Sequence, residues 1–389
     1  MPERRESLIT GIGIVSCLGE GIEAHWQGLN AAPPAADATS FAPYIVHRVV
    51  PLELDRQIPK KGDQRQMEPW QRIGTYAAGL ALDGAGLKGK TEFLARMDMI
   101  VAAGGGERDA QVDLNVAAGV DKAAKAEAFV NERLMSDLRP TLFLAQLSNL
   151  LAGNISIVHG VTGSSRTFMG EESSGVEAVR VAHARIAAGQ SELALVGAAY
   201  NAERWEVMLH FALGRRLARG APKAVWQRTG MELGTIGAFL VIEEKKHARA
   251  RGAPPLARIT MVASDHAKRA PGAVATVLES LWRKLPKLDP AHAAVISGAS
   301  GVAPTTQEER AFLDRTGLAV RGSGTHLGHG LEPQFPANIA LAAIALRHGK
   351  LFAPEDPSEE PMEGALRQVA VTSIGHWRGE GLALIEAVD

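Results

Sequence analysis

The sequence predicts a layered α/β protein built from two related halves. Short β-branched runs with glycine-rich ends alternate with alanine-rich segments of helical spacing, which is typical of helices packed on sheets. The 389 residues are 46% apolar, enough to bury more than one core. A weak internal similarity between residues 236–243 and 379–386 indicates duplication. The connections are too irregular in length for a barrel or a simple dinucleotide-binding fold.

Buried strands are predicted where β-branched residues cluster, at residues 8–16, 99–103, 192–199, 238–243, 294–297, 369–373 and 382–387. Helices are predicted at residues 72–85, 140–151, 176–187, 273–285 and 337–346. A basic segment followed by Pro254 and Pro255 combines a polar helix end with a stop signal, so we expect the seam between the halves near Arg251. The predicted units are residues 1–251 and 252–389.

Composition excludes several classes of function. The 42 basic and 43 acidic residues nearly cancel, so there is no electrostatic footprint for nucleic acid or for an anionic membrane. The longest apolar runs fall far short of the roughly 20 residues that cross a bilayer. Charged residues 1–6 run directly into a strand without an apolar leader, so we expect a cytoplasmic protein. The single cysteine, Cys17, excludes an intrachain disulfide and a multi-cysteine metal site.

Gly11 and Gly13 follow a hydrophobic strand, as the glycines of a dinucleotide loop do. However, Ser16 stands where the third glycine belongs, and no acidic residue ends a second strand about 20 residues on. We therefore predict no nucleotide cofactor.

Residues 8–19 form a hydrophobic strand that ends in Thr-Gly-x-Gly-x-x-Ser-x-x-Gly. This segment resembles the first strand and turn of the β-ketoacyl-[acyl carrier protein] synthase II-like condensing enzymes of the thiolase superfamily. Residues 139–163, 189–197 and 230–244 resemble later segments of the same enzymes, and the resemblance extends over essentially the whole chain. It implies a thiolase-like five-layered α-β-α-β-α fold with two related halves, dimerising through strands near the nucleophile.

In this family the nucleophile is a cysteine at the N-terminus of a buried helix, activated by the helix dipole and flanked by an oxyanion hole of backbone N–H groups. Counting back from Gly189, and forward from Gly160 and Gly163, places that position on Glu172. A carboxylate that attacked an acyl thioester would form a mixed anhydride, which is too labile in water to store the acyl group. Ordinary acyl transfer is therefore not expected.

The family also uses two histidines to decarboxylate the malonyl extender and stabilise the enolate. The first lies in Ala-His-Gly-Thr-x-Thr; in the matching residues 298–304 we assign its position to Ala299. The second lies in Lys-x-x-x-Gly-His-x-x-Gly; in residues 321–329 we align His326 with the histidine and Arg321 with the lysine. The resemblance thus implies Glu172, His326 and Arg321 as the site residues, with one family histidine lost.

Two further segments depart from the family pattern. The Gly-Glu-Gly of the first half is replaced at residues 234–236 by Gly-Thr-Ile, and the glycine-rich gating loop is replaced at residues 375–378 by Gly-His-Trp-Arg. A bulky residue where the backbone must rearrange favours a static plug.

Simpler interpretations of these residues stay open. Glu171 and Glu172 can be two carboxylates at a helix N-terminus, worth up to about 1 kcal/mol each and without chemistry. Alternatively, Glu172 mimics a thiolate or an acyl carboxylate and holds the oxyanion hole in one geometry. His326 and His329 have the spacing of a metal pair, but the sequence offers no evident third ligand, so no metal is predicted.

Some relatives are heterodimers in which an active ketosynthase pairs with a chain-length-factor subunit that lacks the cysteine. Residues 62–68, 102–108 and 165–172 resemble the second synthase subunit of bacterial clusters that make very-long-chain hydroxy fatty acids for lipid A. This resemblance implies an active synthase partner and an acyl carrier protein. Two alternatives are a malonyl decarboxylase that uses Glu172 and His326 without condensing, and a non-catalytic carrier-protein-binding or structural homodimer.

Overall fold

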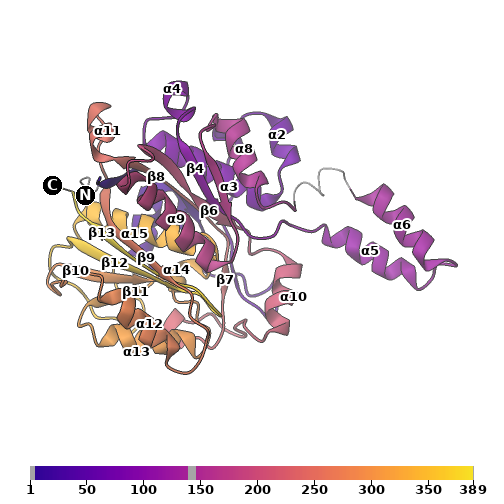
Figure 1. Ribbon diagram of the computed structural model, residues 1–389. Helices are drawn as coiled ribbons and strands as arrows, with labels where there is room; N and C mark the ends of the chain where they lie inside the picture. Colours follow the sequence, from indigo (N-terminus) through magenta and orange to yellow (C-terminus); the bar gives the residue numbers. More distant parts are fainter. Residues whose placement is uncertain (1–4, 139–145, 389) are drawn as a thin grey trace.

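Figure 1 shows the computed structural model, which describes residues 5–138 and 146–388. The strands up to residue 251 are β1 (Ser7–Ser16), β2 (Gly19–Glu20), β3 (Val46–His47), β4 (Asp98–Ala102), β5 (Ser165–Phe168), β6 (Leu193–Tyr200), β7 (Leu233–Gly234) and β8 (Ile236–Glu244). The helices in that part are α1 (Gly21–Leu29), α2 (Lys61–Gln66), α3 (Pro69–Gly84), α4 (Thr91–Leu94), α5 (Ala110–Val120), α6 (Ala126–Asp137), α8 (Leu150–His159), α9 (Glu172–Ala187), α10 (Trp205–Leu213) and α11 (Lys245–Ala250).

The rest of the chain repeats this kind of alternation. Its strands are β9 (Ala257–Asp265), β10 (Ala293–Ser297), β11 (Ala319–Gly322), β12 (Gln368–Ile374) and β13 (Glu380–Glu386). Its helices are α12 (Ala273–Trp282), α13 (Thr305–Asp314), α14 (Gly324–Leu327) and α15 (Gln334–His348).

The strand order repeats on either side of one central pair. It is β5-β4-β6-β8-β1 in the first half and β11-β10-β12-β13-β9 in the second, and β1 pairs with β9 where the halves meet. In each half the three outermost strands are parallel and the remaining pairs are antiparallel. Strands β8 and β13, which contain the two similar sequence segments, therefore occupy equivalent positions.

Helices α9 and α15 form a layer between the two halves of the sheet (Figure 1). Helix α15 is apolar on almost every side and is buried from Gln334 to Leu346, as expected of a helix enclosed by protein. Helices α3 and α8 cover the outer face of the first half, and α12 and α13 cover that of the second. The order of layers is helix, sheet, helix, sheet, helix, which confirms the predicted five-layered α-β-α-β-α fold with two related halves.

Each predicted strand is present within two residues of its predicted bounds, but the predictions lack β5, β9, β11 and the two-residue strands β2, β3 and β7. β5 is short and polar, and β9 mixes exposed and buried positions, so neither carries the apolar run of a buried strand. Part of the predicted helix at residues 140–151 lies outside the described residues; beyond them, helix α8 begins only at Leu150. The boundary at residues 251/252 falls between α11 and β9 and stays a prediction.

The two glycines that resemble a dinucleotide loop lie within strand β1, where they allow the strand to touch helix α3. A Cβ atom on Gly11 would lie 2.2 Å from the carbonyl oxygen of Ala81, and one on Gly13 would lie 1.8 Å from that of Ala77. Strand β1 continues beyond both glycines to Ser16. The glycines thus serve close packing of strand and helix.

Helices α5 and α6 form a hairpin that extends away from the layered body (Figure 1). They pack on each other, yet large apolar side chains on both are exposed, including Leu114 at 63% and Met135 at 79%.

Among the described residues, no helix is both long enough and apolar enough to cross a membrane.

The contact of β1 with α3 gives a test of the fold. We expect Gly13→Ala to lower the free energy of unfolding by about 3 kcal/mol, measured by urea denaturation, because the new methyl group must displace backbone atoms. The control is Gly62→Ala in helix α2, where nothing lies within 4 Å of the new Cβ, and its effect should stay within about 1 kcal/mol. Equal losses in both variants would contradict the packing account.

Candidate functional site

Glu172 is the first residue of helix α9, in the layer between the two halves of the sheet. The chain turns into the helix at Glu171, whose φ of 54° and ψ of −136° are a strained conformation for a residue that is not glycine. Gly170, with φ 139°, precedes it. This sharp turn drives the Glu172 side chain inward, and the residue is only 1% exposed.

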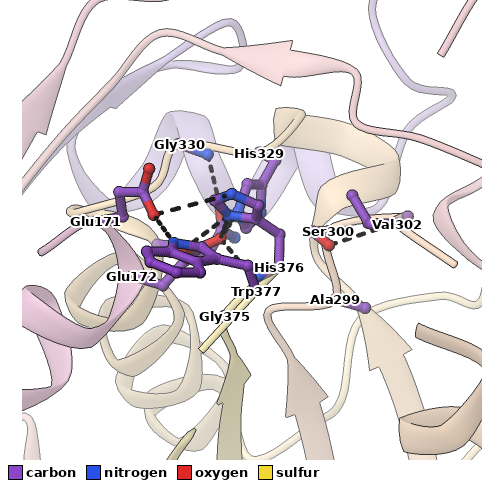
Figure 2. A network of polar contacts seen from close by, with 12 residues as sticks. Glu171, Glu172, Ala299, Ser300, Val302, His329, Gly330, Gly375, His376 and Trp377 are labelled. Atoms are coloured by element: carbon purple, nitrogen blue, oxygen red, sulfur yellow. Dashed lines mark hydrogen bonds and ion pairs between the residues drawn. The ribbon is translucent and has the colours of Figure 1, made fainter. Parts of the chain in front are cut away.

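Two histidines contact the Glu172 carboxylate (Figure 2). His329 Nε2 lies 2.7 Å from Glu172 Oε1, and His376 Nδ1 lies 2.9 Å from the same oxygen and 3.2 Å from Oε2. The backbone N–H of His376 also donates to Oε1, at 3.2 Å. We call Glu171, Glu172, His329, His376 and Trp377 the Glu172 cluster.

The electrostatics of this cluster stabilise a carboxylate–imidazolium pair. Burial alone would raise the pKa of Glu172, but the charge of His376 and the hydrogen bonds from His329 and His376 hold that pKa well below its ordinary value. Burial opposes charge on His376 as well, yet Glu172 and then Glu171 outweigh it and raise the pKa of the ring. The charges therefore compensate each other in a site that excludes water.

Residues 375–379, between β12 and β13, lie over the N-terminus of α9; we call them the gating loop after the family segment that they resemble. The Trp377 indole N–H donates to Glu171 Oε2 at 2.6 Å, and the His376 ring Nε2 lies 3.8 Å from the same oxygen. From outside, Arg216 donates to the carbonyl of His376 and Arg269 to that of Gly375. The gating loop is therefore held by hydrogen bonds on both of its faces.

Glu171, Glu172 and His376 also form a group whose possible metal-ligand atoms lie within 4.8 Å of one another. In this structure those atoms already have partners: His376 Nδ1 contacts the Glu172 carboxylate, and the Trp377 indole occupies Glu171 Oε2. The backbone N–H of His376 also points at Glu172 Oε1, where it would compete with a cation. The arrangement therefore suits a hydrogen-bonded ion pair.

The structure does not bring His326 to Glu172. The ring of His326 lies edge-on to Phe352, with the centroids 6.3 Å apart, and neither ring nitrogen has a hydrogen-bond partner among the described residues. Burial lowers the pKa of His326 to about 4, so the ring is neutral. The Cys17 thiol donates to the backbone carbonyl of His326, which fixes the turn rather than the ring.

Arg321 also lies apart from the Glu172 cluster. It is 1% exposed at the end of β11, and it donates to the carbonyl oxygens of Val320, Phe352 and Glu360. These bonds attach the segment after α15 to the sheet. Arg321 thus holds a loop in place, and only Glu172 of the three predicted site residues lies in the cluster.

Sequence reasoning missed His329, although a signal was present. The family pattern has glycine directly before the histidine, and Gly328-His329 meets this condition whereas Thr325-His326 does not. Gly328 has φ 70°, and a Cβ atom there would lie 2.8 Å from the His47 ring and 2.9 Å from the backbone nitrogen of Gly234. Only glycine fits this position, and counting back five residues from His329 puts Gly324 at the lysine position.

The position of the other family histidine also moves by one residue. The pattern Ala-His-Gly shares its alanine and its glycine with Ala299-Ser300-Gly301. This alignment puts Ser300 rather than Ala299 in the histidine position. Ser300 Oγ accepts a hydrogen bond from the backbone N–H of Val302, and Figure 2 shows it beside the cluster without a dashed line to it. No imidazole stands at this position in either alignment.

The first part of the chain matches a known family model. Residues 5–248 match the model described as "Beta-ketoacyl synthase, N-terminal domain". The chain is 27% identical to a 3-oxoacyl-[acyl-carrier-protein] synthase 2 from Vibrio harveyi over 64% of this chain and 60% of that protein. It spans about six tenths of the length of this relative and of a second one from Vibrio cholerae.

Other similarities extend over nearly the full length. The second β-ketoacyl synthase of actinorhodin polyketide synthesis from Streptomyces coelicolor is 24% identical over 97% of this chain and 98% of its own. Among solved structures, the ishigamide ketosynthase/chain length factor aligns with a TM-score of 0.79 at 20% identity, over 99% of this chain and 100% of that one. A ketosynthase in complex with its type II acyl-carrier protein, AntDE:AntF, aligns with a TM-score of 0.78 at 17% identity, over the same shares. With the family model matching well over half of its residues, this chain belongs to the β-ketoacyl synthase family.

Proposed function

We propose that this chain is a non-condensing subunit of a type II β-ketoacyl synthase, which works beside an active ketosynthase as a chain length factor does. The observation that carries the proposal is the buried contact of Glu172 with His329 and His376. At the nucleophile position the chain has a carboxylate whose oxygens are occupied by hydrogen bonds. Glu172 Oε1 accepts from His329 and from His376, so the carboxylate is held as the partner of two histidines.

Two further features support the loss of condensation. The bond from Trp377 to Glu171 holds the gating loop over the start of helix α9, where the family needs a loop that can open. Ser300 offers no imidazole for decarboxylation of a malonyl group. The nucleophile, one general acid–base group and the access route are therefore all altered together.

The partner surface in this proposal includes strand β5, which lies at the edge of the sheet. β5 pairs with β4 on one side: the carbonyl of Ser164 accepts a bond from Met99 of β4, and that of Phe168 accepts one from Ala103 just after β4. Since hydrogen-bonding groups alternate along a strand, those of Thr167 point away from β4, toward the open edge. Next to this strand Met169 is 67% exposed, and an exposed strand edge with an apolar neighbour is a ready site for pairing.

The proposal extends to the pathway. An acyl carrier protein and an active synthase are the partners, which agrees with the complexes named for the similar structures. The product would be a very-long-chain acyl group carried on the acyl carrier protein and destined for lipid A, because residues 62–68, 102–108 and 165–172 resemble the second synthase subunit of bacterial clusters that make such acyl groups. This synthesis would take place in the cytoplasm.

The decarboxylase alternative has less support. It needs Glu172 and His326 to act on one substrate, but His326 packs on Phe352 and is neutral, while Glu172 is paired with other histidines. A structural homodimer remains compatible with the closed site. The oligomer that forms when a ketosynthase is present distinguishes a homodimer of this chain from a heterodimer with the ketosynthase.

The proposal predicts a clear result in a condensation assay. The purified chain, given acyl and malonyl carrier protein, should form no β-ketoacyl product, and Glu172→Cys should not restore activity because His376, Trp377 and Ser300 remain. With an active ketosynthase, the pair should form product, and omission of this chain should change its amount or chain length. Robust condensation by the chain alone would refute the proposal.

The ion pair of His376 makes closure of the gating loop depend on pH. Because the pKa of His376 is raised, its contribution is complete below the ordinary histidine value of about 6.5 and is lost as pH rises through the folded-state pKa. Because the pKa of Glu172 is lowered, its contribution is complete above about 4.5 and is lost only as pH falls through its folded-state pKa. The loop should therefore be most firmly closed between these limits.

Fluorine NMR of protein labelled with fluorotryptophan measures this closure. The Trp377 signal, assigned by its absence in Trp377→Phe, should shift with a midpoint above about pH 6.5. In Glu172→Gln the midpoint should move to lower pH, since the counter-charge is gone. A Trp377 signal that does not change up to about pH 9, or a midpoint unaffected by Glu172→Gln, would contradict the role of this ion pair.

Strand β5 provides the test of the partner. Thr167→Pro removes the backbone N–H on the open edge but leaves the bonds to β4, so it should weaken co-purification with the active ketosynthase at least tenfold, about 1.4 kcal/mol. Thr167→Val keeps the N–H and should bind normally. Unchanged binding by the proline variant, with circular dichroism equal to that of the parent, would rule out pairing through this edge.

A further inference from the structure

A cavity, which we call the second cavity, lies beside the Glu172 cluster. Its volume is about 270 Å³, and it is lined by Glu171 at the start of α9, by Glu332 after the His329 turn, by the end of β6 and by α10. Tyr200 and Glu206 lie on these last two elements. None of Glu332, Tyr200 and Glu206 was among the predicted site residues.

The cavity carries an excess of negative groups. Three carboxyl groups line it, those of Glu171, Glu206 and Glu332, whereas Arg204 contributes one guanidinium. Arg204 Nε lies 3.4 Å from Glu206 Oε1, so this ion pair accounts for one of the three carboxylates. Of the other two, Glu332 forms no ion pair among the described residues, and Glu171 lies 3.8 Å from His376 Nε2, outside the cavity lining.

Glu332 and Tyr200 each have one buried oxygen without a hydrogen-bond partner among the described residues. Glu332 is 3% exposed and Tyr200 is 6% exposed, and neither Glu332 Oε2 nor the Tyr200 hydroxyl has a partner among the described residues. Buried polar groups in native proteins are almost always satisfied, and an unpaired one costs about 1–3 kcal/mol. The fold nevertheless makes room for the carboxyl group, because a Cβ atom on Gly104 would lie 2.7 Å from Glu332 Oε1.

Burial, together with the negative charges of Glu172 and Glu171, raises the pKa of Glu332 to about 7. A carboxyl group with this pKa is ionised in about half of the molecules at neutral pH. A cation beside it would favour the ionised form, whereas an anion would disfavour it.

Part of the remaining wall is apolar or aromatic. Trp70 and Phe211 line the cavity together with Val207 and Leu331. Aromatic faces next to carboxylates are the surroundings that organic ammonium groups prefer. A long acyl chain fits poorly, because its methylene groups would bury Glu332 and Tyr200 against hydrocarbon with no hydrogen bond.

We infer that this cavity binds a small primary ammonium ligand, whose N–H groups donate to Glu332 and Tyr200 and whose apolar part packs on Trp70 and Phe211. Since one water takes about 30 Å³, the cavity holds roughly nine waters or a ligand with about nine non-hydrogen atoms. This ligand lies next to Glu171 but takes no part in acyl transfer.

Phenethylammonium is a suitable probe, and phenethyl alcohol is its neutral analogue of the same shape. Titrations of the full chain by calorimetry should give at least tenfold tighter binding of the ammonium compound. Glu332→Gln, which keeps the shape of the side chain, should remove this preference, and Tyr200→Phe should weaken binding severalfold. Glu192→Gln, a change of the same kind on another surface, should have no effect.

The dependence on pH gives a further readout. As the pH rises toward about 7, binding of phenethylammonium should strengthen by up to tenfold per pH unit, because Glu332 must lose its proton to bind a cation. Above about pH 7 the affinity should level off. Equal binding of the alcohol, or binding that Glu332→Gln leaves unchanged while the variant keeps its folded-state circular dichroism, would overturn the inference. Absence of binding at about 10 mM probe would show a cavity that holds water only.

Discussion

The buried carboxylate of Glu172 is the constraint on which the rest of the site depends. Placing an unpaired carboxylate in the layer between two sheets would cost several kcal/mol, so the surrounding residues must compensate its charge. His329 and His376 provide this compensation from two separate segments of the second half of the chain. The ion pair thereby links the N-terminus of α9 to the gating loop and fixes both.

The substitutions at this site are therefore understandable only together. A glutamate at the nucleophile position without His376 would be destabilised by burial, and His376 without Glu172 would be a buried ring with one hydrogen-bond acceptor fewer. Trp377 extends the same arrangement to Glu171, and Arg216 and Arg269 hold the loop from outside. The departures that appear unrelated along the sequence form one contact network in space.

The fold could be predicted from the sequence because its strongest elements are apolar on all sides. β8 and β13 are continuous buried runs, and their similarity revealed the duplication, whereas the polar edge strand β5 gave no such signal. At the site, spacing alone placed Glu172 at the start of a helix, and it is the first residue of α9; its match to the family nucleophile stays a prediction. His326 and His329 lie in one short turn, so the sequence does not tell which ring contacts Glu172, and the structure places His329 there.

The geometry of α9 also explains why the two neighbouring glutamates differ. The strained turn at Glu171 sends consecutive side chains in different directions, so Glu172 is enclosed with the histidines whereas Glu171 faces the second cavity and the Trp377 indole. Any cation in that cavity would lie beside the same carboxylate that holds Trp377. A carboxylate shared between two partners binds each of them less strongly, so a bound cation would weaken the hold of Glu171 on Trp377. The strained turn at Glu171 thus lies between the gating loop and a polar cavity.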